Sequence, residues 1–353
     1  MKVTDLPTPA LLLDLEFLSR NAAIMDDIRK GTSMELYPHY KSHKCVEIAK
    51  LQLEWGAKGI TCSKLSEAMD LCDAGIDNIV IANQIVQKEK LGFLADLAKR
   101  CRLTVCVDHA ENIMALERAM AAKDARLNVL VEYDAGMHRC GVESYEEALL
   151  LANLIKSQTH LNFEGIQAYA GHISHERDAK ARRNELLRIE RDVAKLKIYL
   201  VAHGVDVNHV CGGSTGYAAD KPKDTVYTQL QCGSYLFMDA SFLPMDLPFY
   251  HALTVFATVL SVKKDRVILD CGVKSLAMDQ EKPYFPDYPG AEAEFHEEHT
   301  ILHIKDSTLR PGDRVYCIPG HCCTTTNSFA AIHVVKVDDV VAGFPITSRG
   351  CSQ

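Results

Sequence analysis

One lysine in the segment Tyr37–Lys44 has a sequence context suited to binding an aldehyde. Lys41 directly follows the apolar, strand-like run Leu36–Tyr40. A lysine that is desolvated in a pocket has a lowered pKa, and its amine can form an imine with an aldehyde. The alternative interpretation is a solvated lysine at the start of a helix, which describes Lys44 better than Lys41.

Two glycine-rich segments later in the chain have the composition of phosphate-binding turns. They read Cys211-Gly212-Gly213-Ser214-Thr215-Gly216 and Gln231-Cys232-Gly233-Ser234-Tyr235. Backbone N–H groups in such turns can approach a dianion closely, and the hydroxyl groups add donors. Many such segments are plain turns. In this chain the two segments favour Lys41 as an imine-forming lysine over Lys41 as a solvated residue at a helix start.

A histidine and a cysteine near the C-terminal end have the spacing of metal ligands. In Ile318-Pro319-Gly320-His321-Cys322-Cys323-Thr324-Thr325, extended chain would point His321 and Cys323 the same way. An imidazole and a thiolate suit zinc, and water or substrate would have to complete the coordination of a catalytic metal. The alternative is a buried pair of thiols beside a turn histidine. The pattern assigns no role to Cys322.

The elements that must position these residues alternate between strand-like and helical runs. Eight strand-like runs are separated by amphipathic segments, which predicts a closed (β/α)8 barrel, although a doubly wound open sheet has a similar pattern. The runs are Leu36–Tyr40, Gly59–Cys62, Ile79–Ala82, Leu103–Val107, Val129–Glu132, Phe163–Tyr169, Val207–Cys211 and Tyr227–Gln231. In a barrel, Lys41 and both glycine-rich segments would meet at the mouth, at the carboxyl ends of the strands.

Beyond Met238 the helical periodicity fades and strand-like runs dominate. They are Ala252–Val262, Arg266–Asp270, Arg314–Ile318 and Ile332–Val337. This change predicts a C-terminal β-domain that carries His321 and Cys323.

The composition excludes several classes of protein. A net charge of −8 argues against a nucleic-acid-coating protein, and an odd number of cysteines, 13, argues against a secreted disulfide framework. No apolar stretch approaches the length of a membrane span. We therefore expect a cytoplasmic protein with no membrane or nucleic-acid partner.

The order of the motifs resembles the D-serine dehydratase and D-threonine aldolase family, which comprises fold type III pyridoxal-phosphate enzymes related to alanine racemase. The resemblance covers nearly the whole chain. Its motifs are Thr8–Asp14, Pro38–Lys44, Asp134–Gly141, Gln167–His172, the two glycine-rich segments, Asp270–Lys274 and Pro319–Cys323. It implies that the N-terminal strand joins the β-domain. The expected domains are therefore a barrel at 20–238 and a β-domain formed by 1–19 plus 239–353.

The same resemblance implies roles for individual residues. Lys41 would hold pyridoxal phosphate and remove the Cα proton, and Arg139 would contact the cofactor's ring oxygen. The cofactor-binding set implied is Lys41, Arg139, Gln167, Tyr169, His172, Ser214, Thr215, Gly216, Gly233, Ser234 and Tyr235. A surface arginine, a structural tyrosine and a satisfied histidine remain the alternatives for Arg139, Tyr169 and His172.

The resemblance also implies a reaction on a small D-3-hydroxy amino acid, such as D-serine, D-threonine or D-3-hydroxyaspartate. Members with His-x-Cys resemble dehydratases and those with His-x-Asp resemble aldolases, so Cys323 favours elimination to an oxo acid and ammonia. The alternative is an aldolase that releases glycine and an aldehyde, with His43 as a possible base. A regulatory pyridoxal-phosphate-binding protein is a second alternative. A racemase would need a second base, for which Tyr284 and Tyr288 are only loop candidates.

Two further expectations concern the metal and the assembly. The cysteine ligand favours zinc, with manganese or magnesium as alternatives. The resemblance implies a homodimer in which each barrel mouth faces the other chain's β-domain.

Overall fold

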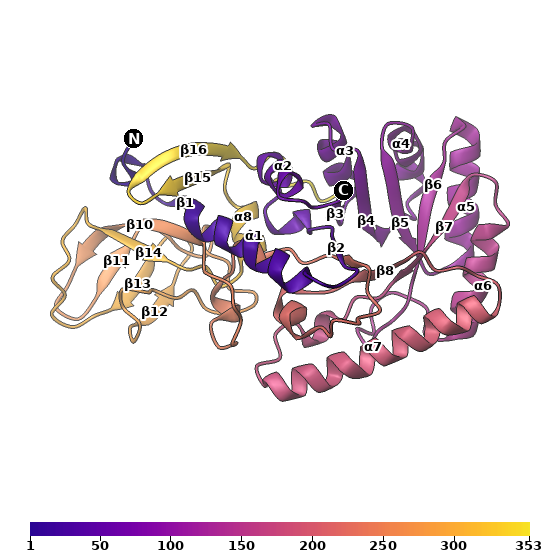
Figure 1. Ribbon diagram of the computed structural model, residues 1–353. Coiled ribbons are helices and arrows are strands. Elements are labelled where there is room, and N and C mark those ends of the chain that lie inside the picture. Colours follow the sequence, from indigo (N-terminus) through magenta and orange to yellow (C-terminus); the bar gives the residue numbers. More distant parts are fainter. The chain divides into compact units, whose positions relative to one another are not determined.

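The computed structural model describes residues 1–353, which divide into two compact units (Figure 1). The barrel unit comprises Asp26–Lys41, Ala49–Gly233 and Cys351–Gln353, and the sheet unit comprises Met1–Met25, Ser42–Ile48 and Ser234–Gly350. We describe each unit by itself. The domain boundaries expected from the sequence stay a prediction.

Eight parallel strands form the centre of the barrel unit. They are β2 (Glu35–Leu36), β3 (Ile60–Cys62), β4 (Asn78–Gln84), β5 (Arg102–Val107), β6 (Leu127–Glu132), β7 (Leu161–Gln167), β8 (His209–Gly212) and β9 (Gln229–Leu230). Their order is β2-β9-β8-β7-β6-β5-β4-β3. A parallel bridge between His39 and Thr61, with the Thr61 N–H donating to the Pro38 carbonyl at 3.0 Å, joins the two ends of this order. The predicted (β/α)8 barrel is therefore confirmed.

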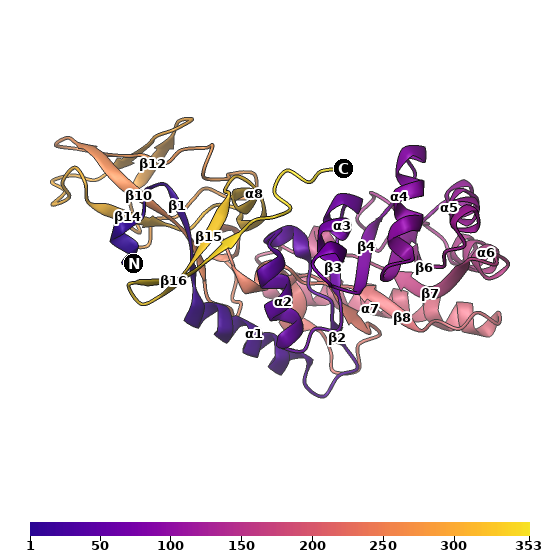
Figure 2. The same ribbon diagram turned by 90° about the horizontal axis from the view of Figure 1, so that it is seen from above.

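The helices of the barrel unit lie outside the strands, and α3 to α6 follow one another around them (Figure 2). The helices are α2 (Val46–Glu54), α3 (Leu65–Asp73), α4 (Lys88–Ala98), α5 (Ala110–Lys123), α6 (Tyr145–Lys156) and α7 (Ala179–Ala202), with 3-10 turns η2 (Tyr40–Ser42), η3 (Gly171–Ile173) and η4 (Thr215–Asp220). Helix α1 (Leu15–Arg29) and helix α2 both cross the division between the units.

The burial pattern explains why these segments adopt this architecture. In α6, Ser144 caps the first turn, and the buried positions Ala148, Leu151, Ala152 and Ile155 recur at helical spacing. All of β6 is buried: Val129 and Val131 belong to the large core that includes the helices, whereas Leu130 belongs to a separate buried cluster. That cluster consists of Tyr37, Val80, Cys106, Leu130 and Cys211, which come from strands of the barrel or directly follow one.

The sheet unit is built around the N-terminal strand. Its strands are β1 (Ala10–Asp14), β10 (Leu253–Val262), β11 (Val267–Leu269), β12 (Glu292–Phe295), β13 (Thr300–His303), β14 (Arg314–Cys317), β15 (Ala331–Lys336) and β16 (Asp339–Pro345). Strand β1 lies between β10, which runs antiparallel to it, and β15, which runs parallel. The unit also contains η1 (Val3–Asp5), η5 (Ser234–Leu236), η6 (Ala240–Phe242) and the short helix α8 (Cys322–Asn327).

This arrangement confirms that the C-terminal β-domain takes the N-terminal strand. The sequence pattern missed β12, β13 and β16. Strands β12 and β16 have a largely exposed or half-buried pattern, so the apolar signal of a buried strand is weak in them. No helix has both the length and the apolar character that crossing a membrane requires.

Candidate active site

Lys41 lies at the mouth of the barrel beside an aromatic ring. It is exposed in η2, just after β2, and its backbone N–H donates to His39 Nδ1 at 3.4 Å. The Lys41 Nζ lies 5.9 Å from the centroid of the Tyr169 ring, and the Arg139 Cζ lies 5.7 Å from the same centroid. The barrel unit thus brings two cationic groups that are 98 residues apart in sequence near the same tyrosine ring.

The loop that carries Arg139 is held by a carboxylate. Asp134 Oδ1 accepts the backbone N–H groups of Gly136 at 2.8 Å and His138 at 3.1 Å. Burial raises the pKa of Asp134, but these backbone hydrogen bonds outweigh it and hold the pKa below its usual range. Gly136 has a φ of 110°, in the region that favours glycine, so the loop shape depends on this residue as well.

The first glycine-rich segment forms a buried turn with a hydroxyl group that has no protein partner. Gly213 has a φ of 98°, and a Cβ on Gly216 would collide with the backbone oxygen of Ser174. Thr215 is 2% exposed, and its Oγ1 has no hydrogen-bond partner. An unpaired buried hydroxyl costs about 1–3 kcal/mol, so a native structure usually supplies a partner for it, from the protein, ordered water or a bound ligand. Ser214 lies half-buried beside it.

The second glycine-rich segment contributes a buried amide to the barrel unit. Gln167, at the end of β7, donates its Nε2 to Gln231 Oε1 at 2.8 Å, while Gln167 Oε1 and Gln231 Nε2 have no partner. Gly233 is buried two residues later. His172 lies at the surface, with its Nε2 3.8 Å from Glu185 Oε1 in α7, so it pairs with a carboxylate of a covering helix.

The other predicted residues belong to the sheet unit. His43 is 1% exposed, accepts the Cys45 N–H at its Nδ1 (3.2 Å), and packs edge-on against Phe237 with ring centroids 6.2 Å apart. Tyr235 is buried, with its ring centroid 5.9 Å from that of Phe249. Both have structural contacts, so His43 also fits a purely structural role just before α2.

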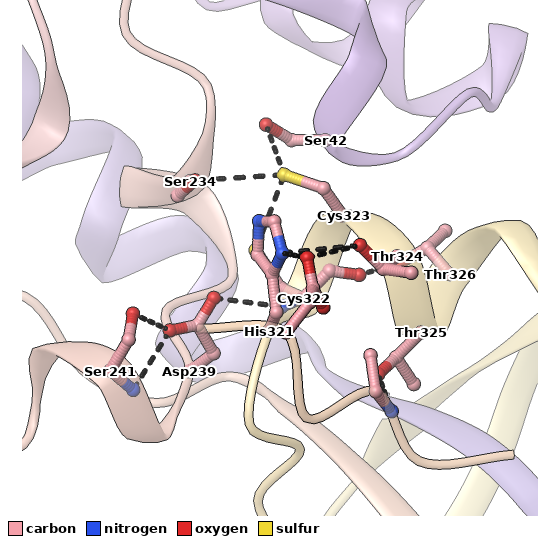
Figure 3. Close-up of polar contacts among 12 residues, drawn as sticks. Ser42, Ser234, Asp239, Ser241, His321, Cys322, Cys323, Thr324, Thr325 and Thr326 are labelled. Carbon is pink, nitrogen blue, oxygen red and sulfur yellow. Dashed lines mark hydrogen bonds and ion pairs between the residues drawn. The ribbon is translucent and has the colours of Figure 1, made fainter. Parts of the chain in front are cut away.

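His321 and Cys323 face one another at the start of α8 (Figure 3). His321 is the extended residue before the helix and Cys323 is its second residue, so the expected extended chain is wrong, although the two side chains still meet. Their role as metal ligands stays a prediction. His321 Nδ1 lies 2.7 Å from Asp279 Oδ2, and the imidazole also hydrogen-bonds to Cys323. Burial lowers the pKa of His321, but the contacts with Cys323 and Asp279 outweigh it and raise the pKa to about 9.

The backbone around this pair is fixed by close contacts. The Gly320 N–H donates to the Ala277 carbonyl at 3.1 Å, and the Ala277 N–H donates to Thr325 Oγ1 at 3.0 Å. A Cβ on Gly320 would lie 2.6 Å from that same carbonyl oxygen, so only glycine permits the approach. Asp239, fully buried, accepts the Cys322 N–H at 2.7 Å.

The Cys323 sulfur is surrounded by hydroxyl and thiol groups. Its thiol donates to Ser42 Oγ at 3.6 Å, and its Sγ lies 3.9 Å from both Ser234 Oγ and Cys322 Sγ. Contact with Cys323, together with complete burial, raises the pKa of the Cys322 thiol. Ser42 directly follows Lys41 and Ser234 directly follows Gly233 in the chain.

The residues present fit a phosphate-bearing aldehyde and a metal ion. The orphaned Thr215 hydroxyl and the glycine-lined turn suit a phosphate group, and the amine of Lys41 suits an aldehyde. His321 and Cys323 offer nitrogen and sulfur donors, with a carboxylate on the far side of the imidazole, as is common around protein-bound metals. No group of three or more His, Cys, Asp or Glu side chains is arranged to hold a metal, so this pair would bind it with only two protein ligands.

Comparisons with known proteins identify the family. The model of the alanine racemase N-terminal domain matches residues 13–241, and that of the putative serine dehydratase domain matches residues 252–335. A D-threonine aldolase of an Arthrobacter species is 36% identical over 98% of this chain and 93% of its own length. The chain belongs to the D-serine dehydratase and D-threonine aldolase family.

Solved structures of family members have the same fold. A D-threonine aldolase from Filomicrobium marinum matches with a TM-score of 0.95 and 36% identity, over 100% of this chain and 98% of the other. D-threo-3-hydroxyaspartate dehydratase from a Delftia species matches with a TM-score of 0.89 and 26% identity, over 98% of both chains. Two further structures of a D-threo-3-hydroxyaspartate dehydratase are mutants of a histidine and of a cysteine two positions later, and the cysteine mutant is described as metal-free. The relatives are lyases, and this chain is a lyase with their pyridoxal-phosphate-dependent fold.

The sequence pattern did not identify the residues that contact His321 and its neighbour Cys322 from distant loops. Asp279 is 42 residues from His321, and Asp239 is 83 residues from Cys322. Neither lies in a motif with recognisable spacing, because the contacts arise only when the loops of the sheet unit pack together. Ser42, in contrast, lies inside the Pro38–Lys44 motif, so the sequence could have indicated it as a candidate site residue.

Proposed function

We propose that the chain is a pyridoxal-phosphate- and divalent-metal-dependent dehydratase of D-3-hydroxy amino acids. It would convert D-serine, D-threonine or D-3-hydroxyaspartate to an oxo acid and ammonia. The observation that carries this proposal is the contact of the His321 imidazole with Cys323, whose sulfur also contacts Ser42, the residue after Lys41. The dehydratase relatives mutated at a histidine and at a cysteine two positions later have the same residue types at the same spacing.

In this proposal each described side chain has a defined task at the cofactor. Lys41 holds the cofactor and removes the Cα proton of the substrate. Thr215 and Ser214, with Gly216, Gly233 and Ser234, bind the phosphate. Arg139 would contact the ring oxygen of the cofactor, and Tyr169 would lie near its ring. The roles of Gln167, His172 and Tyr235 in binding the cofactor also stay proposals. When bound, pyridoxal phosphate supplies an electron-accepting ring that stabilises charge developing at Cα.

The metal pair has a separate task at the 3-hydroxyl group. His321 and Cys323 would hold the ion, and such an ion supplies Lewis acidity that makes the hydroxyl a better leaving group. Because only two protein donors are present, the substrate hydroxyl and water can take the remaining positions, as a catalytic metal requires. Zinc suits these donors best, and manganese or magnesium is the alternative.

An aldolase is the second candidate, and a specific observation favours it. The aldolase relative from Arthrobacter is 36% identical to this chain, whereas the dehydratase from Delftia is 28% identical over 95% of it. In that reaction a base would remove the proton of the 3-hydroxyl group, and the Cα–Cβ bond would break to give glycine and an aldehyde. His43, buried against Phe237, would need to reach that proton.

Product analysis distinguishes the two candidates. Purified protein loaded with pyridoxal phosphate and zinc is incubated with D-threonine, and the products are identified by mass spectrometry. The proposal predicts 2-oxobutanoate and ammonia in equal amounts. Glycine with acetaldehyde would establish the aldolase instead. Turnover of none of D-serine, D-threonine and D-3-hydroxyaspartate would favour the regulatory alternative.

Assembly and location are also proposals. We infer a homodimer, because the family resemblance implies one. We also infer a cytoplasmic protein, because an odd number of cysteines, 13, argues against a secreted disulfide framework.

A further inference from the structure

The imidazole of His321 is held from behind by a carboxylate that has no role in the proposed reaction. His321 Nδ1 lies 2.7 Å from Asp279 Oδ2, and Thr324 Oγ1 donates to the same Oδ2 at 3.1 Å. A carboxylate at Nδ1 favours the tautomer in which that nitrogen carries the proton. When the ring is neutral, as a metal ligand must be, the lone pair lies on the other ring nitrogen, which faces Cys323 (Figure 3).

The loop that carries Asp279 is fastened to the metal motif at two points. The Ala277 carbonyl accepts the Gly320 N–H, and the Ala277 N–H donates to Thr325 Oγ1 in α8. The loop is therefore anchored both before His321 and after Cys323, two residues from Asp279 itself. Because Gly320 leaves no room for a Cβ at this crossing, the approach of the two segments is close and specific.

We propose that Asp279 is a positioning residue that fixes the tautomer and orientation of His321 for metal binding. This inference rests on the proposed metal site and adds to it a residue outside the His-x-Cys motif. Partners of this kind typically change metal affinity by about 10–100-fold when removed. The Asp279 side chain is 49% exposed, so its replacement removes the hydrogen bond without opening a cavity in the core.

The chain offers a matched control on the same unit. Glu294 Oε1 lies 2.8 Å from His303 Nε2, which makes a second carboxylate–histidine pair between β12 and β13. Neither residue belongs to the metal motif. Glu294→Gln therefore reports the general effect of weakening an exposed pair of this type.

The test is a titration of the pyridoxal-phosphate-loaded, metal-stripped protein with cobalt(II), followed by its visible d–d bands, and with zinc in competition. The variants are Asp279→Ala, Asp279→Asn and Glu294→Gln. We expect Asp279→Ala to bind metal about 10–100-fold more weakly than the wild type. Asp279→Asn should lose less, because its amide oxygen still accepts the Nδ1 proton, and Glu294→Gln should lose nothing. The absorbance of the bound cofactor should be unchanged in all three.

Wild-type affinity in Asp279→Ala would overturn the inference, as would an equal loss in Glu294→Gln. A wild-type protein that binds no cobalt or zinc would remove the metal site and the inference with it. A wild-type protein that binds metal but forms no oxo acid would overturn the dehydratase proposal alone, and the affinity of the Asp279 variants would still decide the inference.

Discussion

The barrel mouth and the proposed metal pair, His321 and Cys323, differ in how far protein contacts satisfy their polar groups. At the mouth, Lys41 and Arg139 are exposed around Tyr169, and the buried Thr215 hydroxyl has no protein partner. At the metal pair, His321 contacts Asp279 and Cys323 contacts Ser42. The barrel mouth has polar groups that a ligand could hydrogen-bond or pair with, whereas the side chains of His321 and Cys323 already contact other protein groups. We therefore expect substitutions at the mouth to act through the cofactor and those at the pair to act through the metal.

The largest effect is expected at Lys41. Lys41→Ala should remove covalent binding of the cofactor and lower turnover by about 10²–10⁴-fold, since a base at Cα is lost. The measurements are the absorbance of the bound cofactor and the rate of oxo acid formation. Lys50→Ala, on the exposed face of α2, is the control. Retention of both signals in Lys41→Ala would place the cofactor on another amine.

The next largest effect is expected at the metal pair. Cys323→Ala should lower turnover by at least about 100-fold, because the Lewis acid contributes several kcal/mol to the barrier. It should leave cofactor absorbance intact, unlike Lys41→Ala. A chelator should have the same effect on the wild type, reversed by added zinc. Cys101→Ala, in the barrel unit, is the control. Metal-independent turnover would show that the two regions do not serve one reaction.

A smaller effect is expected at Thr215, where one substitution should act differently on the cofactor-free and the cofactor-bound protein. Thr215→Val removes a buried hydroxyl that has no partner, so the cofactor-free protein should keep or gain thermal stability. The same change should weaken cofactor binding by about 1.5–3 kcal/mol if the hydroxyl donates to the phosphate, and Thr215→Ser should bind normally. Thermal melts with and without pyridoxal phosphate measure both effects. A variant destabilised equally in both states would contradict a phosphate role.

The smallest effect is expected from the carboxylate that holds the Arg139 loop. The pKa of Asp134 in the folded chain lies below its usual 3.8. Ionised Asp134 therefore stabilises the folded chain above pH 3.8, and this stabilisation is lost as the pH falls through the lowered pKa. Asp134→Asn should cost about 1 kcal/mol near neutral pH. Denaturant unfolding at several pH values should show this difference shrinking below pH 3.8. A difference that does not depend on pH would exclude the charge as its source.

The sequence predicted the barrel better than it predicted the surroundings of the metal. Eight apolar runs and the helical spacing around residues such as Leu151 and Ile155 are local signals, and the family resemblance implied that the N-terminal strand joins the β-domain. The edge strands β12 and β16 lack a strong apolar signal, because much of their surface is exposed.

The residues that contact His321 and Cys322 from distant loops could not be predicted from one sequence. Asp279 and Asp239 act through contacts between distant loops, and no periodicity relates them to His321 or Cys322. The short helix α8 was also missed. The expected extended chain would have placed His321 and Cys323 on one side by alternation, whereas in the structure the turn into the helix brings them together.

The central claim is that the chain breaks the Cα–H bond of a D-3-hydroxy amino acid and expels the 3-hydroxyl group. D-threonine carrying deuterium at Cα tests it most directly, in ordinary water with the pyridoxal-phosphate- and zinc-loaded protein. We predict 2-oxobutanoate and ammonia, with the deuterium lost from Cα. Glycine that retains the deuterium, together with acetaldehyde, would show that the Cα–Cβ bond breaks instead and would contradict the account.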